Sequence, residues 1–221
     1  MIHTTSKTIF AIEKIMTALK VIFELTKFRL SFLVSFSAIV GFILASDNFN
    51  FIDLLVLGLS GYLVTAASVI NNQILEKELD KKMDRTKNRP LPTNRISKTY
   101  STIISIIFML IGLASMTLYF NLIAGILSLL SLLLYTFVYT PLKKVGPIAV
   151  FIGAIPGALP PLIGWVAFSG QISIEAIIIF SIQFIWQFPH FWAIAWLCDE
   201  DYKKVGFKLL PNRGKKNLNT A

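Results

Sequence analysis

Three residues with oxygen-bearing side chains, Asn72, Glu76 and Asp80, follow one another at intervals of four within residues 71–92. On an α-helix, four residues turn by about 400°, so these side chains share one face and drift by about 40° per step. Stacked carboxylates repel one another unless a cation lies between them. Mg²⁺ prefers hard oxygen ligands, typically one or two carboxylates together with substrate phosphates. The spacing therefore indicates a Mg²⁺ site that binds a diphosphate.

Two arginines follow the acidic residues, at Arg85 and Arg89, and Pro90 then ends any helix. An arginine side chain presents a planar fork that fits phosphate oxygens. Carboxylates for a metal beside arginines for phosphate indicate a diphosphate headgroup at a membrane surface. The alternative is a solvated helix whose acids only offset neighbouring lysines; the two arginines weaken that alternative.

The elements that position these residues are six apolar stretches. Of the 221 residues, 55% are hydrophobic and 15% are charged, whereas about 25% are charged in a typical soluble domain. Crossing a bilayer takes about 20 residues of helix. We predict an all-α fold, a polytopic membrane helical bundle, with six transmembrane helices near residues 30–46, 52–70, 100–119, 122–139, 145–168 and 174–197.

The positive charges lie at the two ends of the chain and in alternate connections between these stretches. All 21 Lys and Arg residues lie in the N-terminal arm, in the connections after the second and fourth stretches, and in the tail, whereas Asp47, Asp53 and Glu175 mark the other connections. By the positive-inside rule, both termini and the acidic cluster are cytoplasmic. The net charge of +9 thus reflects topology, and no basic soluble face indicates nucleic-acid binding.

Composition also limits the class of protein and its division into regions. The apolar content excludes a soluble enzyme and a disordered chain, and the single cysteine, Cys198, excludes a disulfide scaffold. We expect an amphipathic arm at 1–29, a membrane domain at 30–198, and a second acidic motif with a polar tail at 199–221. The first thirty residues lack the pattern of a removable signal peptide or an Arg/Ser-rich leader, which favours a bacterial inner membrane.

The stretch 71–92 resembles the first Asp-rich motif of the UbiA-type intramembrane prenyltransferases, and within them the heme O synthases (protoheme IX farnesyltransferases). Their pattern is Asn, an acid four residues on, Asp four residues on, and then Met-x-Arg-Thr-x-x-Arg-Pro-Leu. The matching residues here are Asn72, Glu76, Asp80, Met83, Arg85, Thr86, Arg89, Pro90 and Leu91. Glu76 departs from the commoner Asp and is one methylene longer, so we expect an altered metal geometry.

Two further segments resemble the same family. Tyr139 and Lys143 match its Tyr-x3-Lys element, which implies that the lysine approaches the diphosphate with help from the tyrosine hydroxyl. The alternative is a lysine that only fixes topology. Residues 146–165 resemble the family's GAxPPLIGW segment and contain eight Gly and Pro residues. We interpret them as a broken helix that walls a cavity.

The remaining segments that resemble the family lie near and after the end of the sixth stretch. Residues 186–191 read WQFPHF, a string that marks heme O synthases. We expect a porphyrin to stack on Trp186 and its aromatic neighbours while His190 approaches iron or a propionate; the alternative is a packed polar histidine. The resemblance also implies a second acidic motif, in which Asp201, and more weakly Asp199, binds the metal–diphosphate complex. The alternative is a solvated acidic cluster.

The resemblance implies the reaction of farnesyl diphosphate with heme b to give heme O, in heme O and heme A biosynthesis for terminal oxidases. The isoprenoid joins a vinyl group and water adds as a hydroxyl, so heme b is a substrate and not a cofactor. Arg85, Arg89 and Lys143 stabilise the leaving diphosphate. The implied Mg²⁺ ligands are Asn72, Glu76, Asp80 and Asp201. Association with heme A synthase or terminal oxidase assembly is a further implied partnership.

Other functions remain open from the sequence. Members of the family have about nine membrane helices, so we expect this chain to be a fragment or a shortened homologue that lacks downstream helices. A prenyltransferase for a quinone precursor and a non-catalytic diphosphate-binding membrane module are the alternatives. A transporter predicts charges inside the spans, but the six stretches contain no Lys or Arg.

Overall fold

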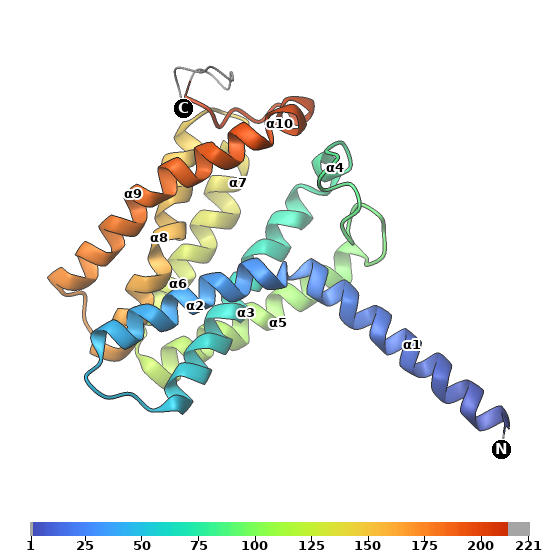
Figure 1. The fold of residues 1–221 in the computed structure, drawn as a ribbon, viewed down its shortest axis with the longest axis horizontal. Coiled ribbons are helices and arrows are strands. Elements are labelled where there is room, and N and C mark those ends of the chain that lie inside the picture. Colours follow the sequence, from blue (N-terminus) through green and yellow to red (C-terminus); the bar gives the residue numbers. More distant parts are fainter. Residues whose placement is uncertain (1, 212–221) are drawn as a thin grey trace.

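The structure is a computed structural model that describes the backbone of residues 2–211 and the side chains of residues 13–211 (Figure 1). It is all-helical over this range, without a strand. Six helical segments are long and apolar enough to cross a membrane, which confirms the six predicted stretches with ends shifted by a few residues. They are Phe28–Ala45, Phe51–Leu75, Lys98–Phe120, Leu122–Leu142, Ile148–Ser169 and Ile174–Leu197.

These spans are built from α-helices and two π-helical segments. The third span is α5 (Lys98–Ser115) with η1 (Met116–Phe120), and the fourth is α6 (Leu122–Leu133), η2 (Leu134–Tyr139) and α7 (Thr140–Leu142). The other elements are α1 (Ile2–Leu25), α2 (Phe28–Ala45), α3 (Phe51–Leu75), α4 (Lys77–Asp80), α8 (Ile148–Ser169), α9 (Ile174–Leu197) and α10 (Asp199–Val205).

Short polar residues mark where several spans begin, as their capping preference predicts. Each side chain accepts a hydrogen bond from a backbone N–H in the first turn of its helix. These residues are Asn50, Ser97, Asn121 and Ser173. Gly170 ends α8 in the left-handed region at φ 71°, a conformation that glycine adopts without steric cost.

Helix α8 lies against α2, α6 and α9 and forms the inner wall of the bundle. The expected break in residues 146–165 is wrong, because α8 is continuous through Pro156, Pro160 and Pro161. Small residues bring α2 and α8 into backbone contact: a Cβ at Gly41 would lie 2.0 Å from the Pro161 carbonyl oxygen. The neighbouring helices thus support a proline-rich helix that remains intact.

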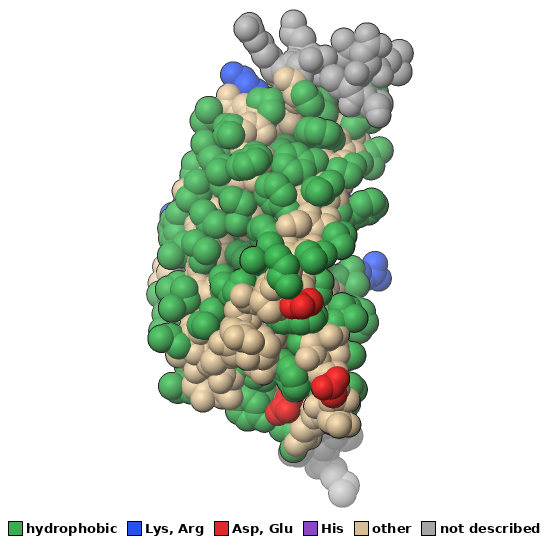
Figure 2. Space-filling view, turned by 90° about the vertical axis from the view of Figure 1, so that its left-hand side faces the viewer, with side chains coloured by type: hydrophobic (Ala, Val, Ile, Leu, Met, Phe, Trp, Pro, Cys, Tyr) green, Lys and Arg blue, Asp and Glu red, His purple; other side chains and the backbone are tan. Residues whose placement is uncertain are grey.

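The outer surface of the bundle is apolar. Figure 2 shows hydrophobic side chains over most of one face, and large hydrophobic residues on all six spans are exposed. An apolar surface of this extent suits contact with lipid and not with water. Helix α1 extends away from the bundle (Figure 1) with Ile15, Met16 and Leu19 exposed. The division into three regions stays a prediction, and the polar tail from residue 212 lies outside the described residues.

Candidate active site

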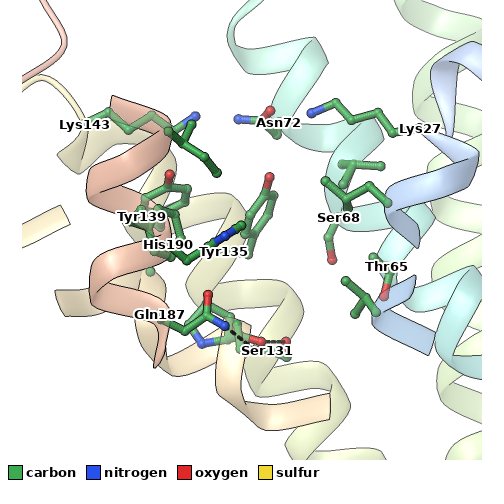
Figure 3. A pocket seen from close by; sticks show the side chains of 18 of the residues that line it. Lys27, Thr65, Ser68, Asn72, Ser131, Tyr135, Tyr139, Lys143, Gln187 and His190 are labelled. Atoms are coloured by element: carbon green, nitrogen blue, oxygen red, sulfur yellow. Dashed lines mark hydrogen bonds between the residues drawn. The ribbon is translucent and has the colours of Figure 1, made fainter. Parts of the chain in front are cut away.

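A cavity of about 420 Å³ lies among α2, α3, the fourth span, α8 and α9. Figure 3 shows Lys27, Asn72 and Lys143 at one level, with Tyr135, Tyr139 and His190 below them, and Gln187 and Ser131 farther in. We call one set of lining residues the charged end: Lys27, Asn72, Glu76, Asp80, Arg85, Arg89 and Lys143. A second set, deeper in the bundle, is the neutral end: Ser131, Pro156, Gly157 and Gln187.

The side chains at the four-residue spacing, Asn72, Glu76 and Asp80, lie together as that spacing predicts. Helix α3 ends at Leu75, yet the Glu76 N–H donates to the Asn72 carbonyl at 2.9 Å and the Asp80 N–H to the Glu76 carbonyl at 2.8 Å. Helical bonding therefore continues from α3 into α4, and Asn72, Glu76 and Asp80 all line the cavity. Glu78 faces outward, where it pairs with Lys81.

Two basic residues neutralise these acids, one from the distant fourth span and one from the loop that follows α4. The Lys143 ammonium lies 2.9 and 3.0 Å from the two Glu76 carboxylate oxygens, and Arg89 donates to both Asp80 oxygens at 2.9 and 3.0 Å. The Asn72 amide donates to Glu76 at 2.9 Å. Both carboxylates are buried, so removal of either partner leaves an uncompensated charge, which typically costs about 3–5 kcal/mol.

The π-helical segment η2 aligns the fourth span on the cavity. Tyr135, Tyr139 and Lys143 follow at intervals of four and all line it. In an α-helix such a series drifts by about 40° per step, and the wider π turn, with its i→i+5 bonds, offsets that drift. The Lys143 ammonium lies 5.0 Å from the centre of the Tyr139 ring, within cation–π range. Tyr135 is a lining residue that the sequence analysis did not identify.

Lys27 is a second residue that the sequence analysis missed, since it was assigned only to topology. It joins α1 to α2 in the left-handed region, at φ 46° and ψ 56°, which is uncommon for a residue other than glycine. Its side chain points toward Asn72 across the cavity (Figure 3). Burial lowers the Lys27 pKa to about 7, and the charges of Arg89 and Lys143 act in the same direction.

The acidic residues of the second motif lie beside the cavity but do not line it. Asp201 accepts the backbone N–H groups of Asp84 and Arg85, each at 2.9 Å, and Lys204 donates to it at 2.9 Å. The Arg85 N–H and the Lys204 ammonium lower the Asp201 pKa to about 2. Asp201 thus holds the loop that follows α4, and its metal binding stays a prediction.

The other residues of this motif have different surroundings. Asp199 is buried and lies 2.7 Å from the Lys203 ammonium. Tyr202 lines the cavity, and burial raises its pKa to about 12. Among the described residues, no three His, Cys, Asp or Glu side chains lie close enough to share a metal ion. A metal at the charged end would therefore need oxygen atoms from Asn72 or from a substrate.

Two predicted heme contacts, Trp186 and His190, lie on α9 and line the cavity. The His190 imidazole points inward (Figure 3) and makes no hydrogen bond within residues 13–211. Phe191 packs edge-on against Tyr139, with ring centres 5.5 Å apart. The geometry leaves the histidine accessible from the cavity, and heme contact stays a prediction.

The chain resembles a known protein family over most of its length. Residues 34–219 match the model of the UbiA prenyltransferase family. The chain is 50% identical to the protoheme IX farnesyltransferase of Cytophaga hutchinsonii over 90% of this chain and 70% of that protein. It is 47% identical to that of Christiangramia forsetii, over 90% of this chain and 65% of that protein. The chain thus spans about two thirds of the length of these relatives.

Solved structures show the same fold. A structure described under the biosynthesis of digeranylgeranylglyceryl phosphate synthase in membranes superposes with a TM-score of 0.75 at 24% identity, over 88% of this chain and 68% of that one. A UbiA homologue from Archaeoglobus fulgidus bound to DMAPP and Mg²⁺ superposes with a TM-score of 0.69 at 21% identity, over 85% and 67%. With the six apolar spans, these findings describe an integral, multi-pass membrane protein.

Proposed function

Because the chain belongs to the UbiA prenyltransferase family, we propose that it transfers a farnesyl group from farnesyl diphosphate to a vinyl group of heme b. The relatives from Cytophaga hutchinsonii and Christiangramia forsetii carry the name protoheme IX farnesyltransferase, which supports this donor and this acceptor. The observation that carries the proposal is the charged end: paired acids and bases gathered at one end of the membrane cavity.

The charged end suits a diphosphate. Lys143 and Arg89 already lie within hydrogen-bonding distance of carboxylates, and they exchange these partners for phosphate oxygens when the substrate enters. Arg85 and Lys27 line the same region. Together these four cations offset the charge that grows on the diphosphate as its C–O bond breaks.

The same residues fit a Mg²⁺ ion. Asn72, Glu76 and Asp80 offer hard oxygen atoms on one side of the cavity, and the ion takes one or two carboxylates besides substrate phosphates. Bound there, Mg²⁺ would supply charge stabilisation at the diphosphate. The Archaeoglobus relative with DMAPP and Mg²⁺ supports this proposal. Asp201 joins this set only if it releases the backbone of the Asp84 loop.

The rest of the cavity suits the carbon skeletons. Aromatic side chains on the fourth span and α9 provide faces for the allylic cation and for a flat porphyrin. The electron-rich vinyl carbon then bonds to the farnesyl C1, and water completes the product as a hydroxyl. Trp186 and His190 are the proposed porphyrin contacts. No covalent enzyme intermediate is needed for this sequence of steps.

The membrane orientation follows from the charges. Positive residues gather in the connections at the charged end of the bundle, which by the positive-inside rule supports a cytoplasmic location for this end. We propose a bacterial inner membrane with the active site facing the cytoplasm. Association with heme A synthase or with terminal oxidase assembly is a partnership consistent with the product.

The test uses the chain expressed in membranes that lack their own heme O synthase. Extracted pigments are analysed by mass for heme O after addition of farnesyl diphosphate and Mg²⁺. We expect heme O with the chain and only heme b with Asp80→Asn, and no product after Mg²⁺ is chelated. Prenylation of a quinone precursor but not of heme b would show that the acceptor is the quinone precursor. Diphosphate binding without any prenylated product would identify a non-catalytic binding module.

A further inference from the structure

Two consecutive prolines leave backbone carbonyls free in the wall of the cavity. Pro160 and Pro161 have no N–H, so the carbonyls of Pro156 and Gly157, four residues earlier in α8, receive no helical hydrogen bond. In the hydrocarbon core an unsatisfied backbone group costs several kcal/mol. These carbonyls therefore need partners from other helices or from a ligand.

Two neighbouring helices supply polar partners. The Ser131 hydroxyl donates to the Pro156 carbonyl at 3.5 Å, and the Gln187 amide donates to the Gly157 carbonyl at 3.3 Å. Both bonds are long, and each carbonyl oxygen keeps a second lone pair. The close approach depends on glycine, because a Cβ at Gly157 would lie 2.5 Å from the Gln187 Oε1 atom.

This neutral end lies below the charged end in the view of Figure 3. Ser131 is near the middle of the span Leu122–Leu142, and Gln187 is near the middle of α9 (Figure 3). Gln187 is buried, yet its Oε1 atom accepts no hydrogen bond within residues 13–211. The middle of the membrane thus contains an amide oxygen, a hydroxyl and two freed carbonyls on residues that line one cavity.

The chemistry of this group selects its ligand. Carbonyl and amide oxygens repel a carboxylate or phosphate and instead accept hydrogen bonds. A water molecule suits a small polar site when it finds two to four partners. If both of its hydrogens point to the Gln187 oxygen and a freed carbonyl, the water presents an oxygen lone pair to the rest of the cavity.

We propose that Ser131, Gln187 and the freed carbonyls of Pro156 and Gly157 bind the water molecule that becomes the hydroxyl of the product. This inference rests on the proposed function. When the vinyl carbon bonds to farnesyl C1, positive charge remains on the carbon attached to the porphyrin. The water lone pair forms a C–O bond there, one O–H bond breaks, and its proton passes to the His190 imidazole, which lines the same cavity.

Without a bound water, the same cation loses a proton from carbon and becomes an alkene. The farnesylated porphyrin is then lighter by one water molecule, and diphosphate is still released. The ratio of alkene to hydroxylated product therefore reports on the neutral end alone, while diphosphate release reports on the charged end.

The test measures both quantities in membranes that contain the full chain, with farnesyl diphosphate and heme b. For Gln187→Leu and Ser131→Ala we expect the alkene fraction to rise about tenfold, as for one lost hydrogen bond, while diphosphate release changes little. Thr65→Val is the matched control, because Thr65 lines the cavity from α3, at a similar depth in Figure 3. It should leave the ratio unchanged.

Several outcomes separate the inference from the proposed function. An unchanged ratio in both Gln187→Leu and Ser131→Ala, with heme O formed by the wild type, overturns the inference alone. A wild type that yields no farnesylated porphyrin overturns the proposed function and this inference with it. Gln187→Leu leaves the Gly157 carbonyl unpaired, so if that variant fails to fold, Ser131→Ala decides.

Discussion

The charged and neutral ends of the cavity achieve polarity in the membrane by different means. The charged end uses full charges, and each of its two buried carboxylates is matched by a lysine or an arginine. The neutral end uses dipoles that become available because two prolines omit two backbone hydrogen bonds. The first arrangement suits a multiply charged ligand, whereas the second suits a small neutral one.

The difference also concerns what happens when a ligand arrives. At the charged end, Lys143 and Arg89 must leave existing partners, so binding is an exchange of ion pairs. At the neutral end, spare lone pairs accept a new donor without loss of an existing bond. A substrate headgroup therefore rearranges one end of the cavity and leaves the other as it was.

Asp80→Asn should have the largest effect and should act at the charged end. The variant loses a proposed metal ligand and leaves Arg89, which is four-fifths buried, without its carboxylate. We expect the rate of farnesyl transfer to fall by about 10²–10³-fold, measured as diphosphate release. Glu76→Asp is the control, since it keeps the carboxylate and should retain activity within about tenfold. An Asp80→Asn rate near that of the wild type contradicts the assignment.

Gly153→Ala and Gly157→Ala separate the two ends directly, one helical turn apart on α8. A Cβ at Gly153 would lie 2.7 Å from the Tyr139 ring, and one at Gly157 would lie 2.5 Å from Gln187. Overpacking of this kind costs about 1–3 kcal/mol, so we expect effects of about tenfold. Gly153→Ala should slow diphosphate release, and Gly157→Ala should raise the alkene fraction of the product.

Gly146→Ala is the matched control for this pair, because a Cβ there would meet no atom within 4 Å. It should change neither quantity. If Gly153→Ala and Gly157→Ala altered diphosphate release and product ratio in the same proportion, the two ends would not be functionally distinct.

Lys27 gives the charged end a dependence on pH that the neutral end lacks. Its pKa is about 7, lowered by burial and by Arg89 and Lys143 and partly restored by Asp80 and Glu76. Below pH 7 the ammonium is already charged. Above pH 7 a diphosphate must bind together with a proton, so its affinity should fall by about tenfold for one pH unit above the pKa.

Titration of diphosphate binding between pH 6 and about pH 8 checks this expectation. Lys27→Met should bind more weakly at low pH and lose the decline, whereas Lys27→Arg should keep tight binding throughout, because its guanidinium stays charged. Equal pH profiles for the wild type and Lys27→Met would exclude Lys27 from the diphosphate site.

The smallest effect is expected for Asp201→Asn, which weakens the contact between α10 and the loop after α4. The Asp201 pKa is depressed to about 2 from 3.8, so its carboxylate stabilises the fold at neutral pH and loses that effect as the pH falls toward 2. We expect a loss of about 1–2 kcal/mol at pH 7, seen as a lower midpoint of thermal unfolding. A gap between variant and wild type that did not shrink at acidic pH would contradict this.

The sequence predicted the parts of the molecule that depend on local patterns. Long apolar stretches became the six spans, and the four-residue spacing of Asn72, Glu76 and Asp80 became one lining face, because both follow from helix geometry alone. The pairing of Glu76 with Lys143 joins residues 67 positions apart. The family resemblance, and not the spacing, brought Lys143 to this site.

The residues that the sequence did not reveal depend on unusual backbone or on tertiary contact. Lys27 reaches the cavity through a left-handed turn, and Tyr135 through a π turn, and neither conformation has a clear sequence signal here. The expected break in α8 was wrong because packing against α2 and α9 keeps the helix intact. The missing N–H groups at Pro160 and Pro161 were visible in the sequence, but their partners, Ser131 and Gln187, were not.

The π turn in the fourth span has a consequence for how this segment tolerates insertions and deletions. A π-helical segment holds one residue more than the α-helical path between the same ends. Deleting a single residue from Leu134–Tyr139 would restore a regular helix and leave the orientation of everything that follows nearly unchanged, whereas a deletion from a regular part of the span would rotate it by about 100°. Lys143 would stay beside Glu76 after the first deletion and would leave it after the second, although no cavity residue had been replaced in either. This one turn is thus the part of the fourth span where the chain best tolerates the loss of a residue.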